Sequence, residues 1–161
     1  MDNDQVEQTI RQYLTQVIHM SLATSADNKP WVSEVHFAYD GNLNLYWISD
    51  TNRRHSIEIE NNPNVSGNIV TQHHLNQKVR GVYFEGVAHK LEGVPPEHPA
   101  YQAYASRFAN APHLAKIGEE GGPRIYQVMV ADWYLFDTYS DGPSKKYRLG
   151  DPSNVASTTE K

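Results

Sequence analysis

Hydroxyl and basic side chains gather where a predicted strand runs into a predicted helix, at Ser49, Thr51 and Arg53-Arg54-His55. Hydroxyl donors, guanidinium groups and the free backbone N–H groups of a helix start can together bind a phosphate group. Cations at a helix N-terminus are unusual, because the helix macrodipole favours anions there. The alternative is a capped surface helix whose arginines are solvated or paired with Glu58 or Glu60. The residues alone leave both interpretations open.

The elements that would position this cluster follow from hydrophobic periodicity. Apolar residues at helical spacing predict a helix over 2–17 and, after the strands that follow it, a short helix over 51–61 that ends before Pro63. A further helix is predicted after Pro99. The predicted strands cover 18–24, 31–39, 43–48, 64–71, 80–91, 125–136 and 145–149. Hairpin-joined strands with only two internal helical insertions favour an antiparallel barrel over a doubly wound parallel sheet.

The strand over 31–39 has two different faces. Period-2 alternation places four apolar side chains on the expected core face: Trp31, Val35, Phe37 and Tyr39. Glu34 and His36 fall on the opposite face and could form an acid–base pair, although a two-residue alternation is weak evidence for catalysis.

Length and composition limit the class of protein. The 161 residues, 39% hydrophobic and 20% charged, predict one domain over 1–149 followed by a disordered polar tail over 150–161. A net charge of -5 with dispersed basic residues argues against nucleic-acid binding. The chain has no cysteine, which excludes disulfide and thiolate chemistry and favours the cytoplasm, and no apolar run predicts a membrane span. The histidines lack the spacing of a zinc hydrolase, so no metal site is expected.

The order of these segments resembles the FMN-binding split-barrel superfamily of pyridoxamine 5'-phosphate oxidase. The resemblance extends from Met20 to Leu149 and is most specific where Arg54-His55 precedes Ile59 and the Asn-Pro-Asn-Val run at 62–65. Other matching segments are 20–24, 29–37, 40–41, 45–49, 80–82, 84–88 and 126–133.

The resemblance implies a six-stranded antiparallel split β-barrel that forms a homodimer, with FMN in a cleft between the subunits. Ser49, Arg54 and His55 match the positions that bind the FMN phosphate, with Arg53 as a neighbour. The residues implied to lie near the flavin ring are Glu34, Val35, His36, Arg80 and Gly81. Trp133 matches a position that contacts the partner subunit's flavin, although burial explains a large ring equally well.

One departure separates this chain from the authentic oxidases. Those proteins resemble each other in a basic, histidine-bearing C-terminal segment that binds the substrate phosphate, whereas this chain has Lys145-Lys146-Tyr147-Arg148-Leu149 and a polar tail. These basic residues form either a solvated edge strand or a second anion contact. The resemblance is therefore to the oxidase's relatives, such as general-stress-type flavin proteins.

Three function classes remain. The first is an FMN-dependent oxidoreductase that acts on an unidentified small substrate or electron donor. The second is a non-catalytic flavin carrier or redox sensor, and the third is a haem-handling split barrel with a surface histidine as the iron ligand.

Overall fold

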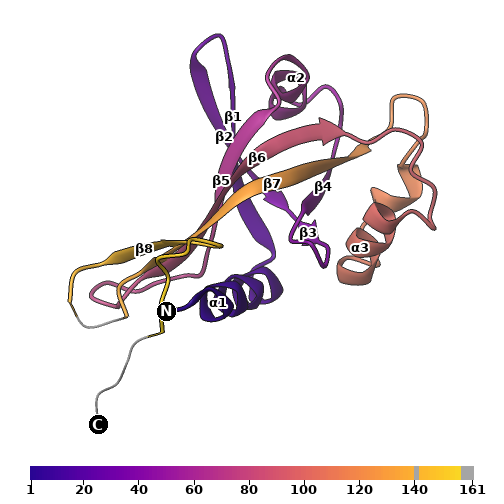
Figure 1. Ribbon diagram of the computed structural model, residues 1–161. Helices are drawn as coiled ribbons and strands as arrows, with labels where there is room; N and C mark the ends of the chain where they lie inside the picture. The colour runs from indigo at the N-terminus through magenta and orange to yellow at the C-terminus, as the bar shows by residue number, and fades with distance from the viewer. Residues whose placement is uncertain (140–141, 157–161) are drawn as a thin grey trace.

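The computed structural model describes residues 1–139 and 142–156. Figure 1 shows three α-helices arranged around one twisted sheet. The helices are α1 (Asn3–Gln16), α2 (Arg54–Asn61) and α3 (Pro99–Arg107), and a short 3-10 helix covers Leu114–Lys116. The strands are β1 (His19–Ala26), β2 (Lys29–His36), β3 (Ala38–Tyr39), β4 (Leu45–Ser49), β5 (Asn64–Val70), β6 (Arg80–Lys90), β7 (Arg124–Asp137) and β8 (Lys145–Arg148).

The strand order describes a curled, half-barrel sheet. The antiparallel strands run in the order β2-β1-β5-β6-β7-β4-β3, and β8 pairs with β7. Only Phe37 separates β2 from β3 along the chain, so the two ends of this order must lie close together. This confirms the predicted split barrel. The described residues form eight strands rather than six, because β3 and β8 are additional short strands of two and four residues.

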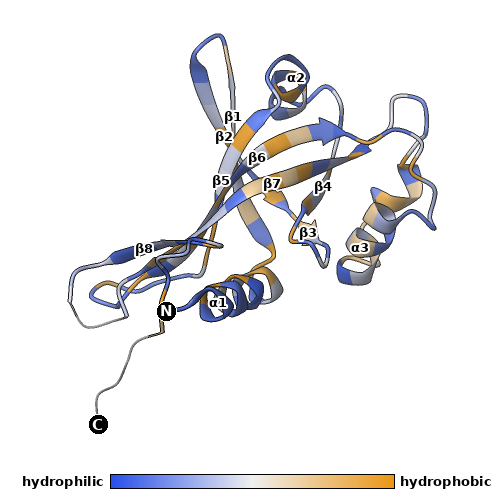
Figure 2. Ribbon diagram, viewed as in Figure 1, coloured by the Kyte–Doolittle hydropathy of each residue, from blue (hydrophilic) through white to orange (hydrophobic). Residues whose placement is uncertain are grey.

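The core lies inside the curled sheet and under α1. Helix α1 begins with a capping box between Asp2 and Gln5, and its apolar stripe, which includes Ile10 and Leu14, is fully buried. Figure 2 shows hydrophilic and hydrophobic residues mixed along this helix. Within the sheet, Trp47 stacks on Tyr126 with ring centroids 5.1 Å apart. No helix in the described ranges is long and apolar enough to cross a membrane.

The predicted core face of β2 is only partly correct. Phe37 is buried and Val35 packs against the core, but Trp31 is 41% exposed. The physical reason is the length of the β1–β2 hairpin, whose tip extends beyond the neighbouring strands beside α2 (Figure 1). Trp31 therefore has no barrel interior to enter.

The first residues of the predicted disordered tail are hydrogen bonded to α1. The Gly150 backbone N–H donates to Asn3 Oδ1 at 2.9 Å, and Asn3 Nδ2 donates to the Asp151 carbonyl at 3.0 Å. Residues 157–161, which the prediction also covers, lie outside the described residues.

Candidate functional site

The first turn of α2 presents uncapped backbone donors. Arg53 occupies the N-cap position, and its side chain makes no capping hydrogen bond. The first N–H groups of an α-helix have no acceptor within the helix. Asp50 fixes the approach to this turn, because its carbonyl accepts from the Arg53 N–H at 3.2 Å and from Ser56 Oγ at 2.9 Å. The end of β4 and the start of α2 are thus joined in one defined geometry.

Arg54 is held in place by an acid on one side and a ring on the other. Its Nε donates to Glu58 Oε1 at 2.8 Å, and its Cζ lies 4.2 Å from the centre of the Trp31 ring. Glu58 is in turn fixed by Thr24, whose hydroxyl donates to Oε2 at 2.6 Å. These hydrogen bonds from Thr24 and Arg54 lower the pKa of Glu58 below its ordinary value.

The pairing with Glu58 does not use the whole guanidinium. The Arg54 side chain is 48% exposed, and within the described ranges no acceptor is hydrogen bonded to its two terminal Nη groups. A guanidinium that is fixed through Nε loses little further freedom when it binds a second anion through Nη. The surface ion pair and the phosphate site, which the sequence offered as alternatives, are therefore compatible in this geometry.

His55 bridges two hydroxyls. Its Nε2 lies 2.8 Å from Ser49 Oγ, and its Nδ1 lies 3.2 Å from Ser33 Oγ. Burial lowers the pKa of His55 and the nearby charge of Arg53 lowers it further, while Glu58 acts in the opposite direction. The neutral imidazole is thus favoured near neutral pH, so His55 supplies an N–H donor and a fixed position rather than a charge.

A small cavity adjoins this cluster. It has a volume of about 120 Å³, and its wall includes Ser49, Asp50, Arg53 and His113. Arg53 is mostly exposed, and its Nη2 lies 3.4 Å from Asp50 Oδ2. His113 comes from the loop before the 3-10 helix and adds a second imidazole to the site.

The predicted acid–base pair on β2 is not formed in this structure. Glu34 accepts a short hydrogen bond from the Ser21 hydroxyl of β1. His36 is stacked between His19 and Phe108, with ring centroids 4.4 Å and 5.3 Å away. Glu34 and His36 therefore have separate partners among the described residues.

Three other predicted cofactor residues lie away from α2. Arg80 and Gly81 begin β6, whereas the other end of that strand approaches α2 through a 2.8 Å contact between Lys90 Nζ and Glu60 Oε1. Trp133 is 5% exposed and belongs to the core. Of the predicted cofactor residues, all of which the structure describes, those that it brings together within one chain are Ser49, Arg53, Arg54 and His55.

Two of the three basic residues of β8 have partners in the sheet. Arg148 Nε donates to Asp132 Oδ1 at 2.6 Å, and Lys146 Nζ lies 4.4 Å from the centre of the Tyr134 ring. These contacts favour the edge-strand interpretation of the segment over a second anion contact.

Sequence reasoning missed several residues of this site. The Thr24 hydroxyl, Ser33 and His113 come from other parts of the chain, and Trp31 was assigned to the core. Trp31 and Ser33 do share one face of β2, as their hydrogen bond between Nε1 and Oγ at 3.0 Å shows. The period-2 spacing of Trp31 and Ser33 was the only signal in the sequence that groups them. It does not reveal that α2 lies opposite this face of β2.

Comparison with known proteins places the chain among related sequences and folds. The sequence model of the family described as pyridoxamine 5'-phosphate oxidase matches residues 6–137. A UPF0306 protein of Photorhabdus laumondii is 26% identical over 102 residues, which are 63% of this chain and 71% of that protein.

Two solved structures have a similar fold. Campylobacter jejuni ChuZ matches 94% of this chain and 63% of its own with a TM-score of 0.74 and 14% identity. HutZ of Vibrio cholerae, described as a heme storage protein, matches 85% of this chain and 95% of its own with a TM-score of 0.64 and 19% identity. At these identities the likeness shows the fold alone.

Proposed function

The chain belongs to the pyridoxamine 5'-phosphate oxidase family, and on that premise we propose that it binds FMN and acts as a flavin-dependent oxidoreductase on a small substrate. The observation that carries the proposal is the state of Arg54. Its Nε is fixed by Glu58 and its face is covered by Trp31, while among the described residues its Nη groups have no hydrogen-bond acceptor, and α2 begins without a side-chain cap. This is the arrangement that a terminal phosphate requires.

The donor set fits the FMN phosphate. Arg54 supplies the fixed charge, the first-turn amides supply N–H groups, and Ser49 supplies a hydroxyl. Ser49 also bonds to His55, so the hydroxyl is already oriented before a ligand arrives. A cavity of about 120 Å³ adjoins Ser49 and Arg53, and Arg54 lies outside its lining.

The flavin, when bound, supplies the hydride or electron transfer. The residues of this chain bind the phosphate, orient it and set the local charge. The substrate that we propose is a small molecule other than pyridoxamine 5'-phosphate, because the basic β8 residue Arg148 is paired with Asp132 rather than open to a substrate phosphate.

We further propose that two copies of the chain form the functional unit. The outer face of the sheet, opposite the core, carries exposed apolar side chains at Val32, Tyr83, Val87 and Met129. Two shallow hollows of about 470 and 310 Å³ lie in the same face and share Ala23, Ser66 and Glu85. A second copy over this face would remove the apolar side chains from water and cover the hollows.

The proposal is tested by absorbance and by flavin titration. The purified protein should show flavin bands near about 370 and 450 nm, and NAD(P)H should bleach them during turnover. Arg54→Ala should weaken FMN binding roughly tenfold to a hundredfold, because a charge-assisted contact is lost, and should leave riboflavin binding nearly unchanged.

The matched control is Arg11→Ala. Arg11 makes the same kind of helical pair as Arg54, with Nε 2.8 Å from Glu7 Oε1, but it lies on α1. Arg11→Ala should change neither the FMN affinity nor the riboflavin affinity. Equal weakening of FMN and riboflavin by Arg54→Ala would contradict the phosphate assignment. An intense band near about 400 nm would instead identify a haem protein, and bound flavin that NAD(P)H does not reduce would favour a carrier or sensor.

A further inference from the structure

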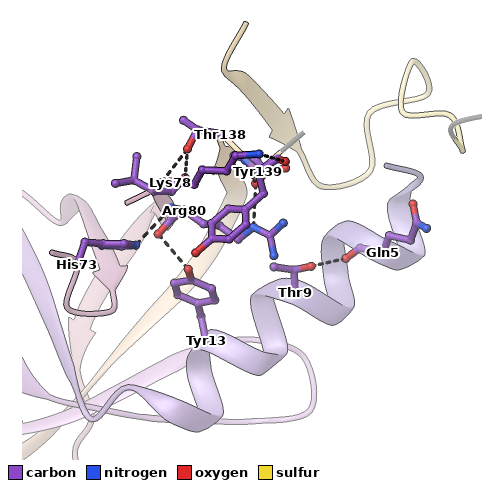
Figure 3. Close-up of polar contacts among 10 residues, drawn as sticks. Gln5, Thr9, Tyr13, His73, Lys78, Arg80, Thr138 and Tyr139 are labelled. Carbon is purple, nitrogen blue, oxygen red and sulfur yellow. Dashed lines mark hydrogen bonds and ion pairs between the residues drawn. The ribbon is translucent and has the colours of Figure 1, made fainter. Parts of the chain in front are cut away.

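A second polar site lies where the end of β7 meets α1. Figure 3 shows Arg80, Tyr139 and Thr9 gathered at this point. Arg80 and Asp137 are cross-strand partners at the ends of β6 and β7. The two residues lie at the other end of β6 from the α2 site, so this region is separate from the proposed FMN phosphate site.

The Asp137 carboxylate fixes the Arg80 side chain by binding its Nε group. Arg80 Nε donates to Asp137 Oδ1 at 3.0 Å, and Asp137 is 1% exposed. The same oxygen accepts from the Tyr139 N–H at 3.1 Å, which places the Tyr139 ring over the guanidinium with its centre 4.7 Å from Cζ. Tyr13 Oη also donates to the Arg80 carbonyl at 3.0 Å (Figure 3). The backbone and side chain of Arg80 are therefore both held.

The outer edge of this guanidinium opens into a hollow. In the part of the chain that the structure describes, neither Nη group of Arg80 donates to a protein acceptor. The hollow has a volume of about 410 Å³, and its walls are formed by Met1, Gln5, Gln8, Thr9, Arg80, Asp137 and Tyr139. Apart from the Arg80–Asp137 pair, the side chains in this list are uncharged, and Met1 adds the N-terminal amino group.

We propose that this hollow binds a small molecule through a carboxylate group. The two Nη groups form a planar fork that matches the two oxygens of a carboxylate. The buried charge of Asp137 offsets much of the positive charge of Arg80, which favours a monoanion over a phosphate dianion. Gln5 and Gln8 line the same hollow, and their side-chain amide groups are neutral donors for the rest of the ligand.

The test uses sodium acetate as the probe, titrated into isotopically labelled protein at constant ionic strength. The wild type should show saturable shifts of the Arg80 Nε signal and of the backbone amides of Gln8 and Thr9. Arg80→Lys keeps the charge but loses the fork, so it should weaken acetate binding about tenfold.

A second variant avoids any change to the buried pair. Gln8 is exposed, and Gln8→Glu adds a negative charge at the wall of the hollow, so it should weaken acetate binding about fivefold. Gln16→Glu makes the same change of charge at another exposed position of α1, outside the hollow, and should bind acetate like the wild type. The FMN affinity of the wild type, Gln8→Glu and Gln16→Glu should be the same. This result would separate the carboxylate proposal from the flavin proposal.

Three results would overturn the assignment. The first is the absence of saturable acetate shifts in the wild type. The second is an equal loss of affinity in Gln8→Glu and Gln16→Glu, which would indicate a general effect of charge. The third is tighter binding of inorganic phosphate than of acetate, which would exclude a carboxylate as the preferred ligand.

Discussion

His55 Nε2 lies 2.8 Å from Ser49 Oγ, and this contact joins the start of α2 to the last residue of β4. On the other side of the ring, Nδ1 contacts Ser33 of β2. Because β2 is at one end of the strand order and β4 is near the other, the imidazole connects the two sides of the barrel opening. Its protonation state should therefore affect the stability of the fold.

The first prediction concerns the dependence of stability on pH. Burial lowers the pKa of His55 in the folded state, whereas the unfolded chain takes up the proton near about pH 6.5. The stabilisation by neutral His55 is therefore fully present above that pH and is lost as the pH falls through the lowered folded pKa. His36 contributes in the same direction, because burial and His19 lower its pKa too.

Urea unfolding of the wild type and His55→Asn between about pH 5 and 8 measures this effect. The free energy of unfolding of His55→Asn should depend less on pH than that of the wild type, and the remaining slope should include the contribution of His36. An identical slope in both proteins would show that His55 does not carry the effect.

The second prediction concerns the acid that holds Arg54. Glu58 is 7% exposed and accepts from both Thr24 and Arg54. Glu58→Gln removes the ionised acceptor and should lower the free energy of unfolding by roughly 1–3 kcal/mol. Glu60→Gln is the control in the same helix, because Glu60 is 52% exposed and pairs with Lys90 at the surface; it should cost less than about 1 kcal/mol. Equal losses measured by urea unfolding would show that Glu58 has no special structural role.

The third prediction tests the proposed second copy. Val87 and Met129 are cross-strand partners on the outer face, 39% and 50% exposed. Val87→Arg should shift the sedimentation coefficient toward that of a monomer at micromolar concentration, because it would place a charge in an apolar contact. Leu75→Arg changes a residue that is 95% exposed in the loop before β6 and should leave the coefficient unchanged. A wild-type protein that sediments as a flavin-loaded monomer would refute the dimer.

The fourth prediction concerns close packing at β5. A Cβ atom added to Gly67 would lie 2.3 Å from the Ser21 carbonyl oxygen and 2.5 Å from Cζ of Phe84. Gly67→Ala should therefore destabilise the protein by roughly 1–3 kcal/mol or more, since neither the β1 backbone nor a buried ring moves freely. At Gly41 an added Cβ would have no neighbour within 4 Å, so Gly41→Ala serves as the control. Thermal unfolding midpoints that agree between the two variants would contradict the packing argument.

Much of the fold could be predicted from local patterns. The periodicity of Ile10 and Leu14 identified α1, Pro63 marked the end of α2, and alternating side chains located the long strands β6 and β7. These features depend on neighbouring residues along the chain. The exposure of Trp31 could not be predicted, because it depends on where the adjacent strands end relative to the β1–β2 hairpin.

The candidate site was predictable only where its residues lie close together in the sequence. Arg53, Arg54 and His55 were found as one run, with Ser49 at the end of the strand predicted before it. Thr24, Ser33 and His113 join them through pairing and packing between distant segments, which a single sequence does not encode in a readable form. For the same reason, the sequence could not show that Arg80 lies at one end of β6 while α2 contacts the other end of that strand.

The position of Trp31 gives the protein an internal optical probe. Of the three tryptophans, Trp47 and Trp133 are buried in the core, and Trp31 alone lies at the surface, stacked on Arg54. A dissolved collisional quencher such as iodide can reach the Trp31 indole but not the other two. The intrinsic emission therefore contains one quenchable component, and that component reports from the side chain that covers the proposed phosphate contact.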